Sequence, residues 1–238
     1  MKIIAIGDIH GRDIWKKIVS NKGPDDIVVF IGDYLDSWDV SPSEQVANFA
    51  RIIAYKKANM DKCILLIGNH DFHYMESSGK YERYSGYSET TKELASDLLE
   101  ESVNQGLLQI AYEKDGYLFT HAGVTREWWK RARGHNPEEK EETVSEFINN
   151  TFTKFPEAFV FAVGRDIYGD DPINSPIWVR PESLEEDRIY GLTQVVGHTK
   201  MDGVRITQKM PNIIYTDVFD YKNEYVEIEN GGVKIIRI

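Results

Sequence analysis

Five short runs of mostly apolar residues, rich in Ile and Val, constrain the fold of this chain more than any other feature. They cover residues 3–6, 27–31, 63–67, 117–119 and 193–196, and small or polar residues follow each one. Consecutive apolar positions over so few residues are typical of strands that are buried on both faces. A helix between two such strands requires them to pair in parallel. The pattern therefore predicts an α/β (α+β) fold.

The segment between the second and third runs begins like a helix. Ser41 is a good N-cap, Pro42 suits the first helical position, and Glu44 completes a capping box. Two further helices are predicted, over 90–105 and over 137–152, the second with acidic residues in its first turn. The helix over 90–105 is expected to turn four apolar side chains inward, those of Leu94, Leu98, Leu99 and Val103.

After Gly203 the sequence is typical of short strands, over 213–216, 225–228 and 233–238, with a turn at 230–232 before the last. We therefore expect the chain to end in antiparallel sheet. The tyrosine-rich segment 74–87, which contains Gly79 and Gly86, is interpreted as a surface loop, with a lid over a site as the alternative.

Length and charge narrow the class of protein. With 238 residues, 41% of them hydrophobic, and no Ser-, Gly- or Pro-rich linker, the chain is expected to form one domain over 1–238. The net charge of −11 argues against binding of long nucleic acid, because polyanions are held by clustered Lys and Arg. A small anionic substrate is compatible with this charge if cations lie in the cleft that binds it.

The first apolar run is too short for a signal-peptide core or a membrane span, since Gly7 and Asp8 end it. The single cysteine, Cys63, stands in an apolar run and is expected to be a buried thiol. We therefore expect a cytoplasmic protein without membrane attachment. Nothing in the sequence predicts the oligomeric state.

The residues that follow the apolar runs are almost all of metal-ligand type. They are Asp8, His10, Asp33, Asp36, Asn69, His70, His121 and His198. Because ligands gather at the carboxyl ends of the strands in open α/β sheets, we expect these side chains to lie together. Each one alone could be a turn residue, a surface imidazole or a histidine at the edge of the core. Together they would repel one another and lose solvation unless cations lay among them.

Five motifs contain these residues: Gly-Asp-x-His-Gly from Gly7, Gly-Asp-x-x-Asp from Gly32, Gly-Asn-His-Asp from Gly68, His-Ala-Gly from His121 and Gly-His-Thr from Gly197. In content and order they resemble the calcineurin-like metallophosphoesterases, particularly the serine/threonine phosphoprotein phosphatases and related bacterial and phage phosphatases. The resemblance extends from Met1 to about Thr216. It implies a calcineurin-like four-layer sandwich, two mixed β-sheets flanked by helices, with a dinuclear metal site at the strand carboxyl ends.

The resemblance also implies roles for these residues. One divalent ion would be bound by Asp8, His10 and Asp33, and a second by Asp33, Asn69, His121 and His198. A hydroxide that bridges the ions would attack phosphorus, while His70 protonates the leaving oxygen and Asp36 holds the imidazole of His70. Oxygen and imidazole ligands without thiolates suit Mn, Fe or Zn, and we expect manganese.

Some phosphate-binding residues of the family are missing. Many members have Arg after the second motif and before the third, where this chain has Ser37, Trp38 and Ile67. None of these replaces the bidentate contact of Arg with phosphate. Substrate contacts are therefore expected from Arg180, in a Trp-x-Arg segment like that of phage and bacterial relatives, and from Arg12. The alternative for Arg180 is a solvated arginine paired with the glutamates at 182, 185 and 186.

Diesterase-type relatives carry another histidine two positions after the last motif histidine, where this chain has Lys200. We therefore predict an enzyme, a hydrolase of phosphomonoesters whose substrate is a phosphopeptide or a small phosphorylated metabolite. Hydrolysis of an anhydride in a dinucleoside polyphosphate is the second hypothesis. A noncatalytic scaffold is the third, and it would be expected to have lost some of these residues.

Overall fold

Two mixed β-sheets form the centre of the protein in a computed structural model that describes residues 1–76, 85–135, 143–162, 164 and 168–238. The first sheet has the strand order β11-β10-β1-β2-β3-β4. Its strands are β1 (Ile3–Ile6), β2 (Ile27–Phe30), β3 (Cys63–Leu66), β4 (Leu108–Gln109), β10 (Glu224–Glu229) and β11 (Gly232–Arg237). Strands β1 to β4 are parallel, whereas β10 pairs antiparallel with both β1 and β11.

The second sheet has the order β5-β6-β7-β9-β8. Its strands are β5 (Ala111–Lys114), β6 (Tyr117–Thr120), β7 (Thr193–Val196), β8 (Arg205–Ile206) and β9 (Ile213–Tyr215). The expected antiparallel end of the chain is confirmed for β10 and β11. It is only partly right for β9, which pairs antiparallel with β8 but parallel with β7. All residues of β9 are buried, as is usual for a parallel strand inside a sheet with both faces covered.

Alternate residues of each strand face different layers, so the central strands are apolar on both sides. Ile3 of β1 belongs to the core between the sheets, where it joins Val29 and Phe119, whereas Ile4 and Phe30 belong to the core beneath the helices. This arrangement explains why the strands are continuous apolar runs in the sequence rather than alternating ones.

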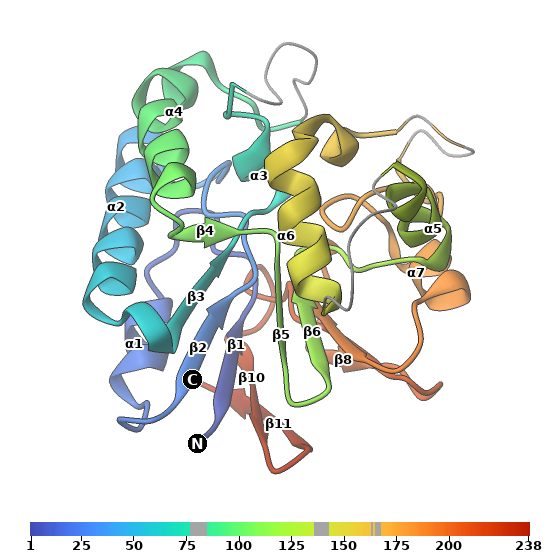
Figure 1. The fold of residues 1–238 in the computed structure, drawn as a ribbon. Helices are drawn as coiled ribbons and strands as arrows, with labels where there is room; N and C mark the ends of the chain where they lie inside the picture. Colours follow the sequence, from blue (N-terminus) through green and yellow to red (C-terminus); the bar gives the residue numbers. More distant parts are fainter. Residues whose placement is uncertain (77–84, 136–142, 163, 165–167) are drawn as a thin grey trace.

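Helices cover both sheets (Figure 1). On the first sheet lie α1 (Trp15–Ser20), α2 (Pro42–Ala58) and α4 (Glu89–Asn104), and on the side of the second lie α5 (Arg126–His135), α6 (Val144–Lys154) and α7 (Pro181–Asp187). Short helical turns occur at α3 (Asn69–Phe72), Met60–Lys62 and Pro156–Phe159. The layers are therefore helix, sheet, sheet, helix, as the family resemblance implied. No described helix is both long and apolar enough to cross a membrane.

Capping boxes mark the starts of two helices, and only one of these boxes was predicted. The predicted box of α2 is confirmed, with Ser41 as N-cap and Glu44 accepting the Ser41 amide proton. The start predicted for the helix over 137–152 is wrong, because Thr143 is extended and caps α6 through its own box with Glu146. Residues 136–142 lie outside the described chain.

The inward face predicted for the helix over 90–105 is partly wrong. Leu99 is buried, but the side chain of Leu94 is 47% exposed. The buried stripe of α4 instead runs through Thr91, Ala95, Leu99 and Ser102. Leu94 lies one residue off this stripe, which is about 100° around the helix. The predicted loop over 74–87 falls largely on residues 77–84, which are outside the described residues.

Candidate metal centre

The predicted ligand residues meet at one edge of the two sheets. Asp8 and His10 follow β1, Asp33 follows β2, and Asn69 begins α3 directly after β3. His121 follows β6 and His198 follows β7, so the second sheet contributes from the opposite side. Because these strands are parallel within each sheet, their carboxyl ends coincide. Each of these side chains except that of His10 is at most 8% exposed.

The amide oxygen of Asn69 faces two imidazole nitrogens. Its Oδ1 lies 2.9 Å from Nε2 of His121 and 2.8 Å from Nδ1 of His198. The other nitrogen of each ring lies 3.0 Å from a backbone carbonyl, that of Ile31 for His121 and that of Trp178 for His198. A carbonyl only accepts, so in the neutral form of either ring the single N–H donates to it and the lone pair of the other nitrogen faces Asn69.

These facing lone pairs indicate a cation site. Burial, followed by the charge of Arg180, lowers the pKa of His198 well below its usual range, so this ring is neutral. Three electron-pair donors that point at one another repel in the absence of a proton between them. A cation among them would turn all three into ligands, and the carbonyl contacts are the outer hydrogen bonds that metal-bound histidines ordinarily make.

A second group of ligand atoms lies next to the first. One atom each from Asp8, His10 and Asp33 lies within 4.8 Å of the others. Nδ1 of His10 lies 2.7 Å from the carbonyl of Leu35, while its Nε2 is 3.8 Å from Oδ2 of Asp33. The same Oδ2 atom is 3.4 Å from Nε2 of His121. Asp33 therefore lies between the two groups, where it is able to contact both.

The backbone is strained at this edge. Among the described residues other than glycine, six have a left-handed φ, and four of these are candidate site residues. They are His10 (φ 42°), Asp33 (51°), Asp36 (62°) and His198 (65°). Such conformations persist where the surrounding structure holds them, and they concentrate at functional sites.

The motif glycines leave room for the carboxylates. A Cβ atom at Gly68 would collide with Oδ1 of Asp33, and one at Gly197 would collide with Oδ1 of Asp8. These glycines precede Asn69 and His198 in the sequence, so each brings one ligand close to an aspartate from another strand. This packing explains why Gly precedes the ligand in both motifs.

Buried carboxylates give the edge an excess of negative charge. Burial first, and then the charges of Asp217 and Asp33, raise the pKa of Asp8 well above its usual range. Asp217 is 4% exposed, and its burial and the charge of Asp33 raise its pKa to about 6. Cations in this place would relieve the repulsion. Asp217 stands in none of the five sequence motifs, although it follows β9 in the same manner as Asp8 follows β1.

Asp71 holds the loops together and was not singled out from the sequence. It is fully buried, and its carboxylate accepts backbone N–H groups of Asp33 (2.8 Å), Tyr34 (2.8 Å) and Gly68 (3.0 Å). It therefore joins the loop after β2 to the loop after β3. Its place at the third residue of α3 gave a signal, since an acidic residue there caps the preceding loop.

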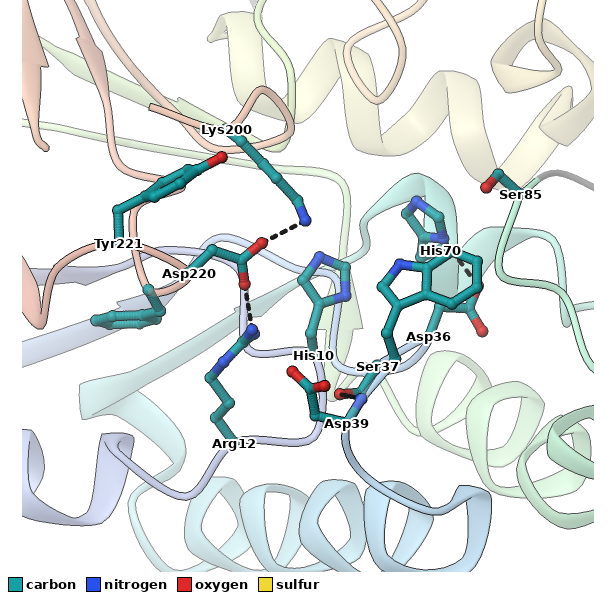
Figure 2. A pocket seen from close by; sticks show the side chains of 12 residues that line it. His10, Arg12, Asp36, Ser37, Asp39, His70, Ser85, Lys200, Asp220 and Tyr221 are labelled. Carbon is teal, nitrogen blue, oxygen red and sulfur yellow. Dashed lines mark hydrogen bonds and ion pairs between the residues drawn. The ribbon is translucent and has the colours of Figure 1, made fainter. Parts of the chain in front are cut away.

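Asp36 and His70 lie together as expected, next to the candidate ligand His10 (Figure 2). Nδ1 of His70 is 2.8 Å from Oδ2 of Asp36. The same oxygen is 2.7 Å from Nε2 of His73, and the hydroxyl of Tyr74 donates to Oδ1. His73 stands apart from the strand ends, so the sequence motifs give it no role. Its spacing of three residues from His70, one helical turn, was the available signal.

Comparison with known proteins agrees with this geometry. The family model for calcineurin-like phosphoesterases matches residues 1–186. The chain belongs to this family. It is therefore a phosphoric ester hydrolase, and its fold and donor set suit the divalent metals that these enzymes use. His198 lies beyond the matched residues but is placed against Asn69 by the structure. No curated protein sequence matches the chain.

Solved structures share the fold of this phosphoesterase. A mutant cold-active protein tyrosine phosphatase has a TM-score of 0.59 at 17% identity, over 98% of this chain and 77% of the other. A protein serine/threonine phosphatase from Saccharomyces cerevisiae has a TM-score of 0.57 at 17% identity. The match covers 100% of this chain and 80% of that protein. A proposed diadenosine tetraphosphatase has a TM-score of 0.50 at 18% identity. The match covers 99% of this chain and 93% of that protein. At such identities the similarity concerns the fold alone.

The two candidate substrate arginines of the phosphoesterase lie in different places. Arg180 precedes α7, and its guanidinium donates to the carbonyls of His198 (3.2 Å) and Tyr168 (3.2 Å) and to Oγ1 of Thr199 (3.1 Å). It is thus held against the loop of a candidate ligand, and Glu185 pairs instead with Arg205. Arg12 contacts Asp220 and lines a cavity of about 710 Å³ with His10 and His70.

Proposed function

We propose that this phosphoesterase hydrolyses phosphomonoesters at a centre of two divalent ions, with manganese as the first candidate and iron or zinc as alternatives. Asp8, His10 and Asp33 would hold one ion. Asp33, Asn69, His121 and His198 would hold the other. The observation that carries this proposal is the convergence of the imidazoles of His121 and His198 on Oδ1 of Asn69, where a cation would be bound by all three groups.

When bound, two adjacent divalent ions lower the pKa of a water, align it with phosphorus and neutralise phosphoryl charge. The chain itself supplies the frame. Asp71 fixes the loops that carry Asp33 and Asn69, and the carbonyl partners of His121 and His198 set the orientation of both rings. Groups held in this way lose little entropy when the substrate arrives.

His70 is the proposed general acid. Its Nδ1 faces Asp36, so Nε2 is the nitrogen free to give a proton to the leaving oxygen. Burial lowers the pKa of His70, but the charge of Asp33 and the hydrogen bond to Asp36 outweigh it and raise the pKa above the usual range. A raised pKa increases the protonated fraction of the ring at a given pH, as an acid requires. Asp36 acts as a positioning residue.

Charge favours monoesters in this site. The two divalent cations, the carboxylates of the proposed ligands Asp8 and Asp33 and one bridging hydroxide would together carry a formal charge of about +1. A positive centre attracts the dianion of a monoester more strongly than the monoanion of a diester. The lysine at position 200, in place of the further histidine of diesterase-type relatives, supports the same preference. Arg180 is the proposed protein contact to the phosphoryl group.

A substrate panel tests the proposal. The protein, loaded with Mn²⁺ and in parallel with Fe²⁺ or Zn²⁺, would be assayed on aryl and alkyl phosphates, aryl phosphodiesters, phosphopeptides and dinucleoside polyphosphates. We expect the highest kcat/KM on a monoester, from a phosphopeptide or a small metabolite. A higher kcat/KM on diesters or dinucleoside polyphosphates would replace the proposed substrate class, and no turnover with any metal would favour the scaffold hypothesis.

The single cysteine bears on the proposed cellular location. We expect a single domain in a reducing, cytoplasmic setting, supported by the free thiol of Cys63, which is fully buried in β3. Burial raises the pKa of this thiol to about 12, so it is unreactive in the folded protein.

A further inference from the structure

Asp220 is shared by two cationic side chains at the mouth of the cavity next to the metal centre. Its Oδ1 contacts Nη2 of Arg12 and its Oδ2 contacts Nζ of Lys200 (Figure 2). The side chains of Arg12, Lys200 and Asp220 are 27%, 48% and 22% exposed. The cluster is therefore open to the cavity rather than buried in the core.

The two cations are tied to the loops that carry candidate metal ligands. Arg12 stands two residues after His10, and Lys200 stands two residues after His198. The backbone of Arg12 is held on both sides, because its N–H donates to Ile9 (2.9 Å) and its carbonyl accepts from Asn48 (2.8 Å). Both cations are therefore carried by the same loops as candidate metal ligands.

Charge and donors in this cluster exceed what Asp220 satisfies. Within the cluster, two positive groups face one carboxylate, which leaves it a formal charge of +1. Of the other acidic residues on the cavity wall, Asp36 is paired with His70 and His73, and Asp39 is exposed. A guanidinium has five N–H donors and an ammonium has three. Each cation contacts only one oxygen of Asp220, so each has further donors that are able to bind another anion. The cavity they line, about 710 Å³, also contains His10 and His70 on its wall. A ligand in it reaches the reaction site and the cluster at once.

We infer that Arg12 and Lys200 form a subsite for a second anionic group of the substrate, a phosphate or carboxylate distinct from the phosphoryl group that is hydrolysed. The inference rests on the proposed function. The hydrolysed group must lie beside the ligands Asp33 and Asn69 and within reach of His70. Arg12 and Lys200 lie beyond His10 from His70 (Figure 2), so they are placed for a different part of the same molecule. Asp220 keeps both cations extended into the cavity before the substrate binds.

Matched aryl phosphates test this subsite. One compound has a neutral ring, one a ring carboxylate and one a ring phosphonate, with leaving-group pKa held equal. We expect wild-type protein to prefer both charged compounds by at least tenfold in kcat/KM, mainly through KM. A larger preference for the phosphonate would indicate a second phosphate in the natural substrate, and a larger one for the carboxylate an acidic metabolite or peptide.

Substitution then identifies the residues. Lys200→Gln and Arg12→Gln should each reduce the preference for the charged compounds at least fivefold. Lys16→Gln is the matched control, because Lys16 also pairs with a carboxylate (Asp13, 3.2 Å) and is similarly exposed, at 46%. It should leave the preference unchanged. Equal kcat/KM for all three compounds in wild-type protein, or a preference that survives in both subsite variants, would overturn the inference.

A binding measurement separates failure of the subsite from failure of the proposed function. Non-hydrolysable benzylphosphonates, with and without a ring carboxylate, would be titrated calorimetrically into metal-loaded protein. If no phosphate ester is hydrolysed, a tenfold tighter binding of the carboxylated compound that Lys200→Gln removes still supports the subsite. Equal binding of the two compounds contradicts it.

Discussion

Nδ1 of His70 lies 2.8 Å from Oδ2 of Asp36, and this contact fixes which nitrogen of the imidazole faces the cavity. Asp36 is itself restrained by His73 and Tyr74, so its carboxylate has little freedom to turn away. The proton on Nδ1 is held by Asp36, and Nε2 is left for the leaving oxygen. Two experiments address this pair separately.

His70→Ala should slow hydrolysis of alkyl phosphates by roughly a hundred- to ten-thousandfold, the usual contribution of a general acid. Aryl phosphates with acidic leaving groups need less protonation, so their loss should be smaller. Metal content, measured by elemental analysis, should not change. Equal losses on good and poor leaving groups would argue against an acid role.

Asp36→Asn should move the alkaline limb of the kcat/KM profile to lower pH. The acid must be protonated, and the hydrogen bond and charge of Asp36 contribute to the raised pKa of His70. Activity is therefore retained below that pKa and lost as pH rises through it, and removing the carboxylate lowers the pKa. Asp39→Asn, which removes an exposed carboxylate from the same cavity, is the control. An unmoved limb in Asp36→Asn would exclude this role.

Asp33→Asn should abolish activity and reduce the metal content of the protein. Asp33 lies between both ligand groups, 3.8 Å from Nε2 of His10 and 3.4 Å from Nε2 of His121. A neutral amide is a weaker ligand than a carboxylate for either ion. Full occupancy of both ions in this variant would contradict the bridging role.

In wild-type protein, a chelator should remove the ion of Asp8 and His10 first, because that group has fewer protein ligands.

Asp71→Ala should destabilise the fold by at least about 3 kcal/mol. Three buried N–H groups, of Asp33, Tyr34 and Gly68, would lose their acceptor, and each unsatisfied group costs about 1–3 kcal/mol. Urea denaturation of the metal-free protein measures this without the contribution of ion binding. Asp13→Ala, at an exposed position, should change stability by only about 0.5 kcal/mol. A similar small change in Asp71→Ala would show that water replaces the carboxylate.

The sequence predicted those parts of the molecule that depend on local patterns. The strands that lead to Asp8, Asp33 and Asn69 are short apolar runs, and the residues after them stand in recognisable motifs. The box at Ser41 likewise placed the start of α2, because its hydrogen bonds join residues three apart.

Features that depend on long-range pairing could not be read in this way. Nothing local to β9 indicates that it lies beside β7, and Asp217, which follows β9, stands in none of the five motifs. His73 reaches Asp36 only because α3 turns it back toward the loop after β2. The contact of Asp220 with Lys200 likewise joins two loops, and their sequence separation gives no hint of it.

Arg180→Ala should lower kcat/KM on aryl monoesters if the guanidinium binds the transferred phosphoryl group. The lost transition-state stabilisation should be roughly 2–4 kcal/mol. Its position supports this, since it lies against the carbonyl of His198, and the charges of Asp33, Asp217 and Asp8 act on it. Burial nevertheless lowers the pKa of Arg180, because a partly desolvated cation is less stable.

The same contacts give Arg180 a second role, in holding the loop of His198, and two further measurements separate the roles. Metal content of Arg180→Ala should equal that of wild type if the loss arises in phosphate binding alone. Arg180→Lys keeps the charge but not the fork of donors, so it should recover only part of the activity. Wild-type protein should also favour aryl monoesters over diesters, because a dianion is attracted more strongly than a monoanion. If Arg180→Ala hydrolyses the monoester within twofold of wild type, the arginine is structural and the phosphoryl group is bound by the ions alone.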